Sequence, residues 1–216
     1  MEEVAARARL IADFDVPRET VEKLELFAAM LTKENEVQNL VSAVSLARIW
    51  NRHLLDSAQL LRFAPSPGAS WIDLGSGPGL PGIVVALLHE GPVTLVEERR
   101  RRIDFLERVV DRLGLLETRI AGAKPNHTPP EPFDVISARA FAPLDRLLAI
   151  GTRFSTEKSR WVLPKGRNAA AELEAARPSW QGDFRLEPSL TDPDARIIVA
   201  EGVRRSGSKG KGSGKR

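Results

Sequence analysis

Hydrophobic and polar positions follow two different periods along this chain, and the period changes near residue 70. Before it, apolar residues recur at helical spacing, most clearly over residues 21–31, and this spacing places one apolar stripe along a helix. A second helix is expected over residues 45–63, with Ser42 or Ser45 as its N-terminal cap. Residues 1–64 are therefore predicted to form a helical N-terminal extension.

After residue 70, short apolar runs alternate with helical stripes. Strands are expected at residues 71–74, 93–97, 119–120, 133–137, 160–163 and 196–200. Helices are expected at residues 83–88, 99–113, 143–152 and 168–176. This alternation is typical of an α/β domain with a doubly wound, mostly parallel sheet that helices cover on both faces. We assign residues 65–202 to it.

In sheets of this kind, ligands bind at the carboxyl ends of the strands, near the point where the strand order reverses. Four segments follow predicted strands and are expected to meet at that edge. They are Gly75–Gly82, Glu97, the strand end at Ser137, and Pro164–Gly166.

The glycine-rich segment Asp73–Gly82 fits two ligand-binding patterns. One is D-x-G-x-G-x-G, which includes Gly79. The other is G-x-G-x-x-G starting at Gly77, with the acidic residue Glu97 twenty positions beyond it, as in dinucleotide-binding proteins. In both patterns, glycine lets the backbone turn sharply and lie directly against a ligand.

The charge around this loop favours a cationic ligand. A pyrophosphate needs free backbone N–H groups at a helix N-terminus, and Pro78 and Pro81 remove two of them. Asp73 adds a carboxylate just before the loop. S-adenosylmethionine is a sulfonium with an ammonium group and no phosphate, and it suits this chemistry. Dinucleotide binding and a turn without any ligand remain alternatives.

Several motifs together resemble the RsmG (GidB) family of bacterial 16S rRNA guanine-N7 methyltransferases. The similarity extends from about residue 20 to 166. It is carried by the glycine loop and by Leu95–Glu97, Phe105-Leu106, Ser137–Ala142, Asn39-Leu40, His53–Ser57 and Lys165-Gly166.

The resemblance implies a class I, Rossmann-like fold. It also implies methyl transfer from S-adenosylmethionine to N7 of guanine 527 in the 530 loop of 16S rRNA, within the small ribosomal subunit or an assembly intermediate. It assigns the donor site to Gly75, Leu80, Glu97, Pro125, Asn126 and Arg139. The loop analysis adds Asp73, Gly77 and Gly79.

Arg139 is the candidate catalytic residue, because a planar guanidinium after the fourth main strand can contact donor, guanine or phosphate. Its alternative role is a salt bridge to Asp73 or Asp134. Phe141 is expected either to stack on a base or to pack in the core. Lys165 is expected to contact phosphate or to lie solvated on the surface.

His53 and Asp56 lie on the second N-terminal helix, in the segment that resembles the family. A lone histidine on an apolar helix face, such as His53, is expected to be structural. Asp56 is expected to cap the helix or to pair with Arg52.

Net charge is distributed unevenly along the chain. Residues 203–216 contain six Lys and Arg and no acidic residue, so residues 1–202 carry a net charge of −3 within the total of +3. This tail is too polar to bury surface and is predicted to be disordered. It either attracts RNA phosphates or acts as a solubilising terminus.

Composition excludes several other classes of protein. Cysteine is absent, which excludes disulfides and thiolate metal sites, and no metal site is predicted. No apolar run reaches the length of a membrane span, and the acidic N-terminus does not resemble a signal peptide. We expect a cytoplasmic monomer. Alternative functions are a non-catalytic RNA-binding protein of the same fold, or a methyltransferase acting on another RNA site or a small molecule.

Overall fold

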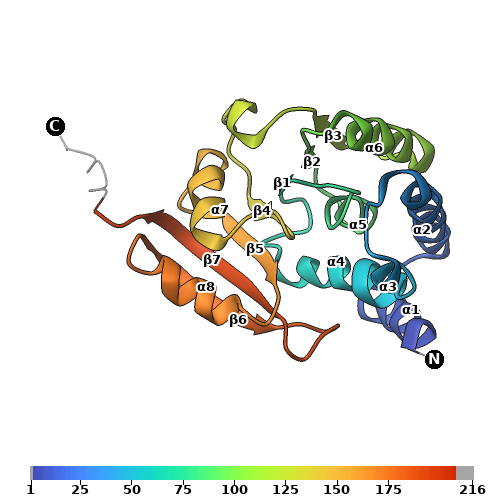
Figure 1. Cartoon of the computed structure of the whole chain (residues 1–216), viewed down its shortest axis with the longest axis horizontal. Coiled ribbons are helices and arrows are strands. Elements are labelled where there is room, and N and C mark those ends of the chain that lie inside the picture. Colours follow the sequence, from blue (N-terminus) through green and yellow to red (C-terminus); the bar gives the residue numbers. More distant parts are fainter. Residues whose placement is uncertain (1, 208–216) are drawn as a thin grey trace.

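A seven-stranded sheet forms the centre of the protein (Figure 1). The structure is a computed structural model, and it describes residues 2–207. The strands are β1 (Trp71–Leu74), β2 (Val93–Val96), β3 (Thr118–Ala121), β4 (Val135–Ser137), β5 (Arg160–Lys165), β6 (Trp180–Pro188) and β7 (Arg196–Arg205).

The strand order is β3-β2-β1-β4-β5-β7-β6. Strands β1 to β5 are parallel, whereas β7 runs antiparallel to both of its neighbours. The chain proceeds outward from β1 to β3 and then returns to place β4 on the other side of β1. The prediction of a doubly wound, mostly parallel α/β sheet is therefore confirmed, and the strand order reverses between β1 and β4.

Helices cover both faces of this sheet. They are α1 (Glu2–Asp13), α2 (Arg18–Gln38), α3 (Ala43–Leu46), η1 (Trp50–Leu55), α4 (Asp56–Ala58), η2 (Gln59–Phe63), α5 (Gly82–Leu88), α6 (Arg100–Leu113), η3 (Pro125–His127), α7 (Leu144–Gly151), η4 (Thr152–Phe154) and α8 (Ala169–Ala176). None of the helices within residues 2–207 is both long and apolar enough to cross a bilayer.

Alternate residues of the strands contribute to two separate hydrophobic cores. Trp71 belongs to the core shared with α1, α2, α5 and α6. Its neighbour Ile72 belongs to the core shared with α7 and α8. Successive side chains of a strand point to opposite faces, so the sheet holds the N-terminal helices on one side and the later helices on the other. The first core contains residues on both sides of residue 64. It therefore shows no boundary there, and the division of the chain at residue 64 stays a prediction.

The predicted helix over residues 45–63 is divided into four shorter pieces. Ser42 caps the first of them, α3, by accepting a hydrogen bond from the Ser45 amide at 3.2 Å. The Glu3 carboxylate of α1 accepts hydrogen bonds from the amides of Trp50 (2.8 Å) and Asn51 (3.1 Å). These two amides are bound by a side chain rather than by the preceding turn, so the helix restarts as the wider π-helical turn η1.

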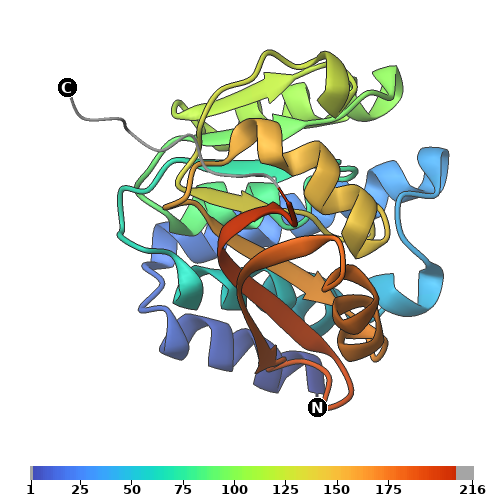
Figure 2. The same cartoon turned by 90° about the vertical axis from the view of Figure 1, so that its left-hand side faces the viewer.

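The C-terminal end differs from the prediction in two respects. Strand β6 has no counterpart among the predicted strands, because most of its residues are exposed and its apolar side chains form no long run, and among the described strands it pairs with β7. The tail boundary placed at residue 203 is wrong, since β7 continues to Arg205. Figure 2 shows the β6–β7 hairpin from its outer side. The predicted disorder of residues 208–216 lies outside the described residues.

Candidate donor and RNA site

A cavity of about 950 Å³ opens at the carboxyl ends of β1, β4 and β5. Its wall includes the glycine loop after β1, residues 139–143 after β4 and residues 164–166 at the end of β5. Residues of η1, of the segment 40–45 and of the loop between β6 and β7 also contribute to the wall. The cavity lies beside the point where the strand order reverses, as predicted, and it is the size of a small-molecule site.

Five of the six backbone N–H groups in the glycine loop, residues 75–82, are already used inside the protein. Pro78 and Pro81 have none. The remaining pairs are Ser76 N to Val96 O (2.9 Å), Gly77 N to Glu97 Oε2 (2.9 Å), Gly79 N to Ser76 O (2.8 Å), Leu80 N to Ser76 O (3.1 Å) and Gly82 N to Asp73 Oδ2 (3.2 Å). A pyrophosphate would need these donors. The loop therefore suits a ligand without phosphate.

Glu97 braces the loop from the end of β2. Besides the Gly77 amide, its carboxylate accepts hydrogen bonds from the amides of Glu98 (2.9 Å) and Arg99 (2.8 Å). Arg102 approaches it at 3.7 Å. Three of roughly four acceptor positions of a carboxylate are thus occupied, which leaves about one for a ligand hydroxyl.

Asp73 is fully buried beneath the loop and links β1 to β4 and α5. Its Oδ1 accepts a hydrogen bond from Ser137 Oγ at 2.9 Å, and Ser137 Oγ in turn accepts one from Trp71 Nε1 at 2.8 Å. Its Oδ2 accepts the Gly82 amide at the start of α5. Burial raises the pKa of Asp73 to about 6, against the lowering effect of these hydrogen bonds and of the Arg139 charge.

We expect the raised pKa of Asp73 to make the folded protein less stable as pH rises from about 4 to 6. In that window the folded state keeps a proton that the unfolded state has released, and the total loss is about 3 kcal/mol. Asp73→Asn removes this contribution. Urea unfolding at a series of pH values measures the free energy of unfolding of both proteins. Between about pH 4 and 6 this free energy should fall more for the wild type than for the variant, and an equal change in both would refute the assignment.

The ring of Phe141 lies on the backbone of Gly75. A Cβ built at Gly75 would approach Phe141 Cδ2 to 2.3 Å, and Gly75 has a left-handed φ of +71°. Phe141 also packs against the core below α7 and α8. The core-packing alternative for Phe141 is thus realised, with the ring forming part of the cavity wall.

The guanidinium of Arg139 is held by residues of the N-terminal helices. Its Nη1 donates to Asp56 Oδ2 and to the Arg52 carbonyl, and its Nη2 donates to His53 Nδ1, each at 3.3 Å. The predicted alternative of an ion pair with Asp73 or Asp134 is therefore wrong, because the acid paired with Arg139 is Asp56.

The expectation that Asp56 pairs with Arg52 is also wrong. Arg52 pairs instead with Asp192 of the β6–β7 loop at 3.1 Å. The reason is geometric: Arg52 reaches Asp192 of the loop, while the two oxygens of Asp56 are bound to Thr191 and Arg139.

His53 is buried and uncharged at neutral pH. Burial, together with the nearby charges of Arg139 and Arg52, lowers the pKa of His53 to about 4. Because arginine has no acceptor, His53 Nδ1 must accept the Arg139 hydrogen bond, and the ring proton is on Nε2. The histidine expected to be structural therefore contacts the candidate catalytic arginine directly.

Lys165 is not a solvated surface lysine, which contradicts one of its two predicted roles. Its side chain is 11% exposed. Its Nζ donates to the Ala142 carbonyl at 3.0 Å and to Glu172 Oε2 at 2.8 Å. The second contact places an ion pair between β5 and α8 at the cavity wall.

The structure gathers some of the predicted site residues in the cavity wall and places others outside it. The wall contains Gly75, Gly77, Leu80 and Arg139. The others are Asp73 and Glu97, buried beneath or beside the loop, together with Gly79, Pro125 and the exposed Asn126. Sequence reasoning missed the residues that the β6–β7 loop contributes to the wall, Ser189, Asp192 and Ala195. Their Ser/Asp/Pro-rich segment signals only a turn.

Solved structures of low sequence identity share this fold. The ribosomal protein L11 methylase of Lactobacillus delbrueckii subsp. bulgaricus aligns over 71% of this chain and 78% of its own, with a TM-score of 0.56 and 16% identity. MtNAS in complex with S-adenosylmethionine aligns over 83% of this chain and 74% of its own, with a TM-score of 0.58 and 16% identity.

Sequence relatives are much closer. The Ribosomal RNA small subunit methyltransferase G of Rhizorhabdus wittichii is 52% identical over 95% of this chain and 96% of its own length. The protein of the same name from Zymomonas mobilis is 49% identical over 86% of this chain and 87% of its own. The GidB family model, described as rRNA small subunit methyltransferase G, matches residues 20–190. The chain therefore belongs to the rRNA small subunit methyltransferase G (GidB) family.

Proposed function

We propose that this protein transfers a methyl group from S-adenosylmethionine to N7 of guanine 527 in the 530 loop of 16S rRNA, in the cytoplasm. The observation that carries the proposal is the glycine loop at the cavity wall, where five of the six N–H groups are bound internally. Family membership supports small-subunit rRNA as the substrate.

The residues present fit the methyl donor. Gly77 and Leu80 belong both to the loop and to the cavity wall. Gly77 has a left-handed φ of +56°, and within 4 Å of its missing Cβ lie only Arg102 Nη1 (3.6 Å) and the Gly75 carbonyl (3.8 Å). Glu97 keeps about one acceptor position for a ribose hydroxyl. When bound, S-adenosylmethionine supplies an electrophilic methyl group on a positively charged sulfur.

Attack by guanine N7 requires no general base. The nitrogen has a lone pair and no proton, so the protein has no proton to remove before the methyl group is transferred. The work left to the side chains is to hold and orient the two reactants, which is worth up to about 7–11 kcal/mol in favourable cases. Arg139, at the cavity wall with a permanent charge, is the proposed catalytic residue.

Cationic side chains line the same cavity and suit an RNA substrate. Arg52, Arg102, Lys165 and Arg196 belong to its wall together with Arg139. Four of these five pair with an acid, namely Asp56, Glu97, Glu172 or Asp192. Arg196 donates instead to the carbonyls of Pro193 and Ala195. It has no acidic partner among the described residues, so its charge is available to a phosphate group of the RNA.

We expect calorimetry to detect binding of S-adenosylmethionine and no binding of NAD at the same concentration. The reason is that five of the loop amides that the pyrophosphate of NAD would need are already hydrogen-bonded. Adenosine serves as a control for binding of the nucleoside alone. Tight binding of NAD, without binding of the methyl donor, would contradict the proposal.

The base and its position are tested in cells. Mass mapping of small-subunit RNA, from cells that lack this protein and from cells that regain it, should show one N7-methylguanine at position 527 only when the protein is present. A methyl group at another nucleotide would show a different RNA site. Binding of RNA with a steep salt dependence and no methyl transfer would show a non-catalytic RNA-binding protein.

A further inference from the structure

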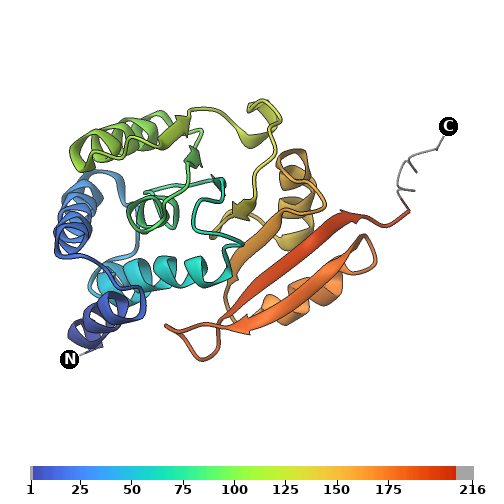
Figure 3. The ribbon, with the colours of Figure 1, turned by 180° about the vertical axis from the view of Figure 1, so that it is seen from behind.

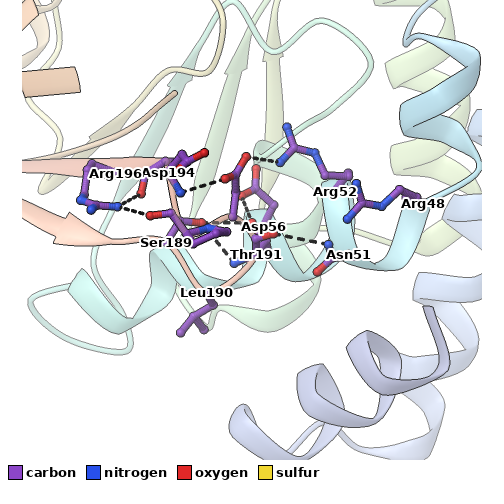
Figure 4. A network of polar contacts seen from close by, with 12 residues as sticks. Arg48, Asn51, Arg52, Asp56, Ser189, Leu190, Thr191, Asp194 and Arg196 are labelled. Carbon is purple, nitrogen blue, oxygen red and sulfur yellow. Dashed lines mark hydrogen bonds and ion pairs between the residues drawn. The ribbon is translucent and has the colours of Figure 1, made fainter. Parts of the chain in front are cut away.

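The loop between β6 and β7 is fastened to the N-terminal helices by a continuous polar network (Figure 4). Seen from behind, the loop end of this hairpin lies beside α1 (Figure 3). Gln59 accepts the Leu190 amide at 2.7 Å, and Asn51 donates to the Thr191 carbonyl at 3.4 Å. The loop also supplies residues to the cavity wall. These contacts connect the last hairpin to the N-terminal helical segment whose residues bind the Arg139 guanidinium.

Asp56 is the residue at which the loop and Arg139 meet. Its Oδ1 accepts two short hydrogen bonds, from Thr191 Oγ1 at 2.7 Å and from Gln59 Nε2 at 2.8 Å. Its Oδ2 accepts the longer one, from Arg139 Nη1 at 3.3 Å. The side chains of Asp56 and Arg139 are 17% and 19% exposed. The two short bonds fix the plane of the carboxylate, and this plane determines where Oδ2 points.

The contacts of Arg139 leave part of its guanidinium available. Three acceptors, Asp56, Arg52 and His53, take up three of its five N–H groups. All three lie on η1 and at the start of α4, so one helical segment orients the group. Two N–H groups remain for a ligand in the cavity.

We propose that Asp56 is a positioning residue for Arg139, and that Thr191 of the β6–β7 loop fixes Asp56 in that role. The inference rests on the proposed function of Arg139 in methyl transfer. It assigns the last hairpin a part in the reaction: the hydroxyl of Thr191 holds Asp56 Oδ1, and Asp56 Oδ2 then holds the guanidinium toward the cavity.

The variant pair Thr191→Val and Thr191→Ser tests this assignment. Valine has nearly the shape of threonine but lacks the hydroxyl, whereas serine keeps it. We expect Thr191→Val to lower kcat on small-subunit RNA about fivefold with an unchanged KM for S-adenosylmethionine, in line with the loss of one ordinary hydrogen bond that acts on Arg139 through Asp56. Thr191→Ser should retain wild-type kcat. In an Arg139→Ala background, the two variants should have equal turnover.

A second readout does not depend on turnover. In nitrogen-labelled protein, the guanidinium N–H resonances of Arg139, assigned by their loss in Arg139→Ala, should shift and broaden in Thr191→Val and in Asp56→Asn, and remain in place in Thr191→Ser. Unchanged resonances in Thr191→Val, or equal kcat for the valine and serine variants, would overturn the inference. Wild-type protein that transfers no methyl group to the RNA would instead refute the proposed function, and the resonances would still decide the positioning role.

Discussion

Arg139→Ala is expected to lower methyl transfer to small-subunit RNA by about a hundredfold at saturating donor, the effect of losing a charged hydrogen-bond donor from a largely buried site. The side chain is 19% exposed and lies in the cavity wall. Its pairing with Asp56, His53 and the Arg52 carbonyl gives it one orientation. Turnover with S-adenosylmethionine labelled in its methyl group measures the effect.

Arg177→Ala is the matched control for this variant. Arg177 also pairs with an acid, Glu174 at 2.8 Å, but its side chain is 51% exposed and it lies at the end of α8. We expect this control to retain wild-type turnover. Equal rates for Arg139→Ala and wild type would show that the catalytic assignment is wrong.

Removal of the basic tail provides a further comparison. The cut belongs after Gly207, because Arg204 and Arg205 are part of β7 and the Arg205 guanidinium lies 5.0 Å from the centre of the Trp180 ring. We expect the truncated protein to lose far less turnover at low salt than Arg139→Ala. A truncation that abolished turnover while Arg139→Ala had no effect would overturn the site described above.

Gly77→Val is expected to weaken binding of S-adenosylmethionine by at least about a hundredfold, because it places a β-branched side chain in a left-handed conformation at the loop that faces the donor. Gly77 has a φ of +56°, and its missing Cβ would lie 3.6 Å from Arg102 Nη1. The new side chain would therefore occupy space between the loop and Arg102 at the cavity wall. Calorimetry measures the loss of affinity.

Gly114→Val separates backbone strain from obstruction of the site. Gly114 ends α6 with a φ of +63°, and no atom lies within 4 Å of its missing Cβ. Both variants should lose about 1–2 kcal/mol of folding stability from the left-handed backbone, while Gly114→Val binds the donor like wild type. Similar affinities for the two variants would contradict a donor site at the glycine loop.

Local sequence patterns predicted most of the fold and the location of the site. The glycine loop was recognisable because a left-handed backbone requires glycine, and Gly75, Gly77 and Gly79 all have positive φ. The helix expected over residues 99–113 was also predicted correctly, since its bounds depend on neighbouring residues. Strand β6 was missed because an exposed edge strand carries little hydrophobic pattern.

The partners of the charged residues could not be predicted in the same way. Arg139 and Asp56 are 83 residues apart in sequence, and Asp56 and Thr191 are 135 apart. A local pattern contains no information about which of several nearby acids an arginine meets, and Asp73, Asp134 and Asp56 were equally available to Arg139. The fold placed η1 and α4 opposite the residues after β4, and this packing selected Asp56.

The sequence by itself determined the alternation of the parallel strands with their helices, the turn at the end of β1 and the absence of thiol chemistry, because each depends on residue type and short-range spacing. The tertiary structure decided how the cavity is closed and how its arginine is oriented. Both depend on contacts among η1, the segment after β4 and the β6–β7 loop. Such contacts arise only when segments distant in sequence pack together, since hydrogen bonds and ion pairs act over a few ångströms.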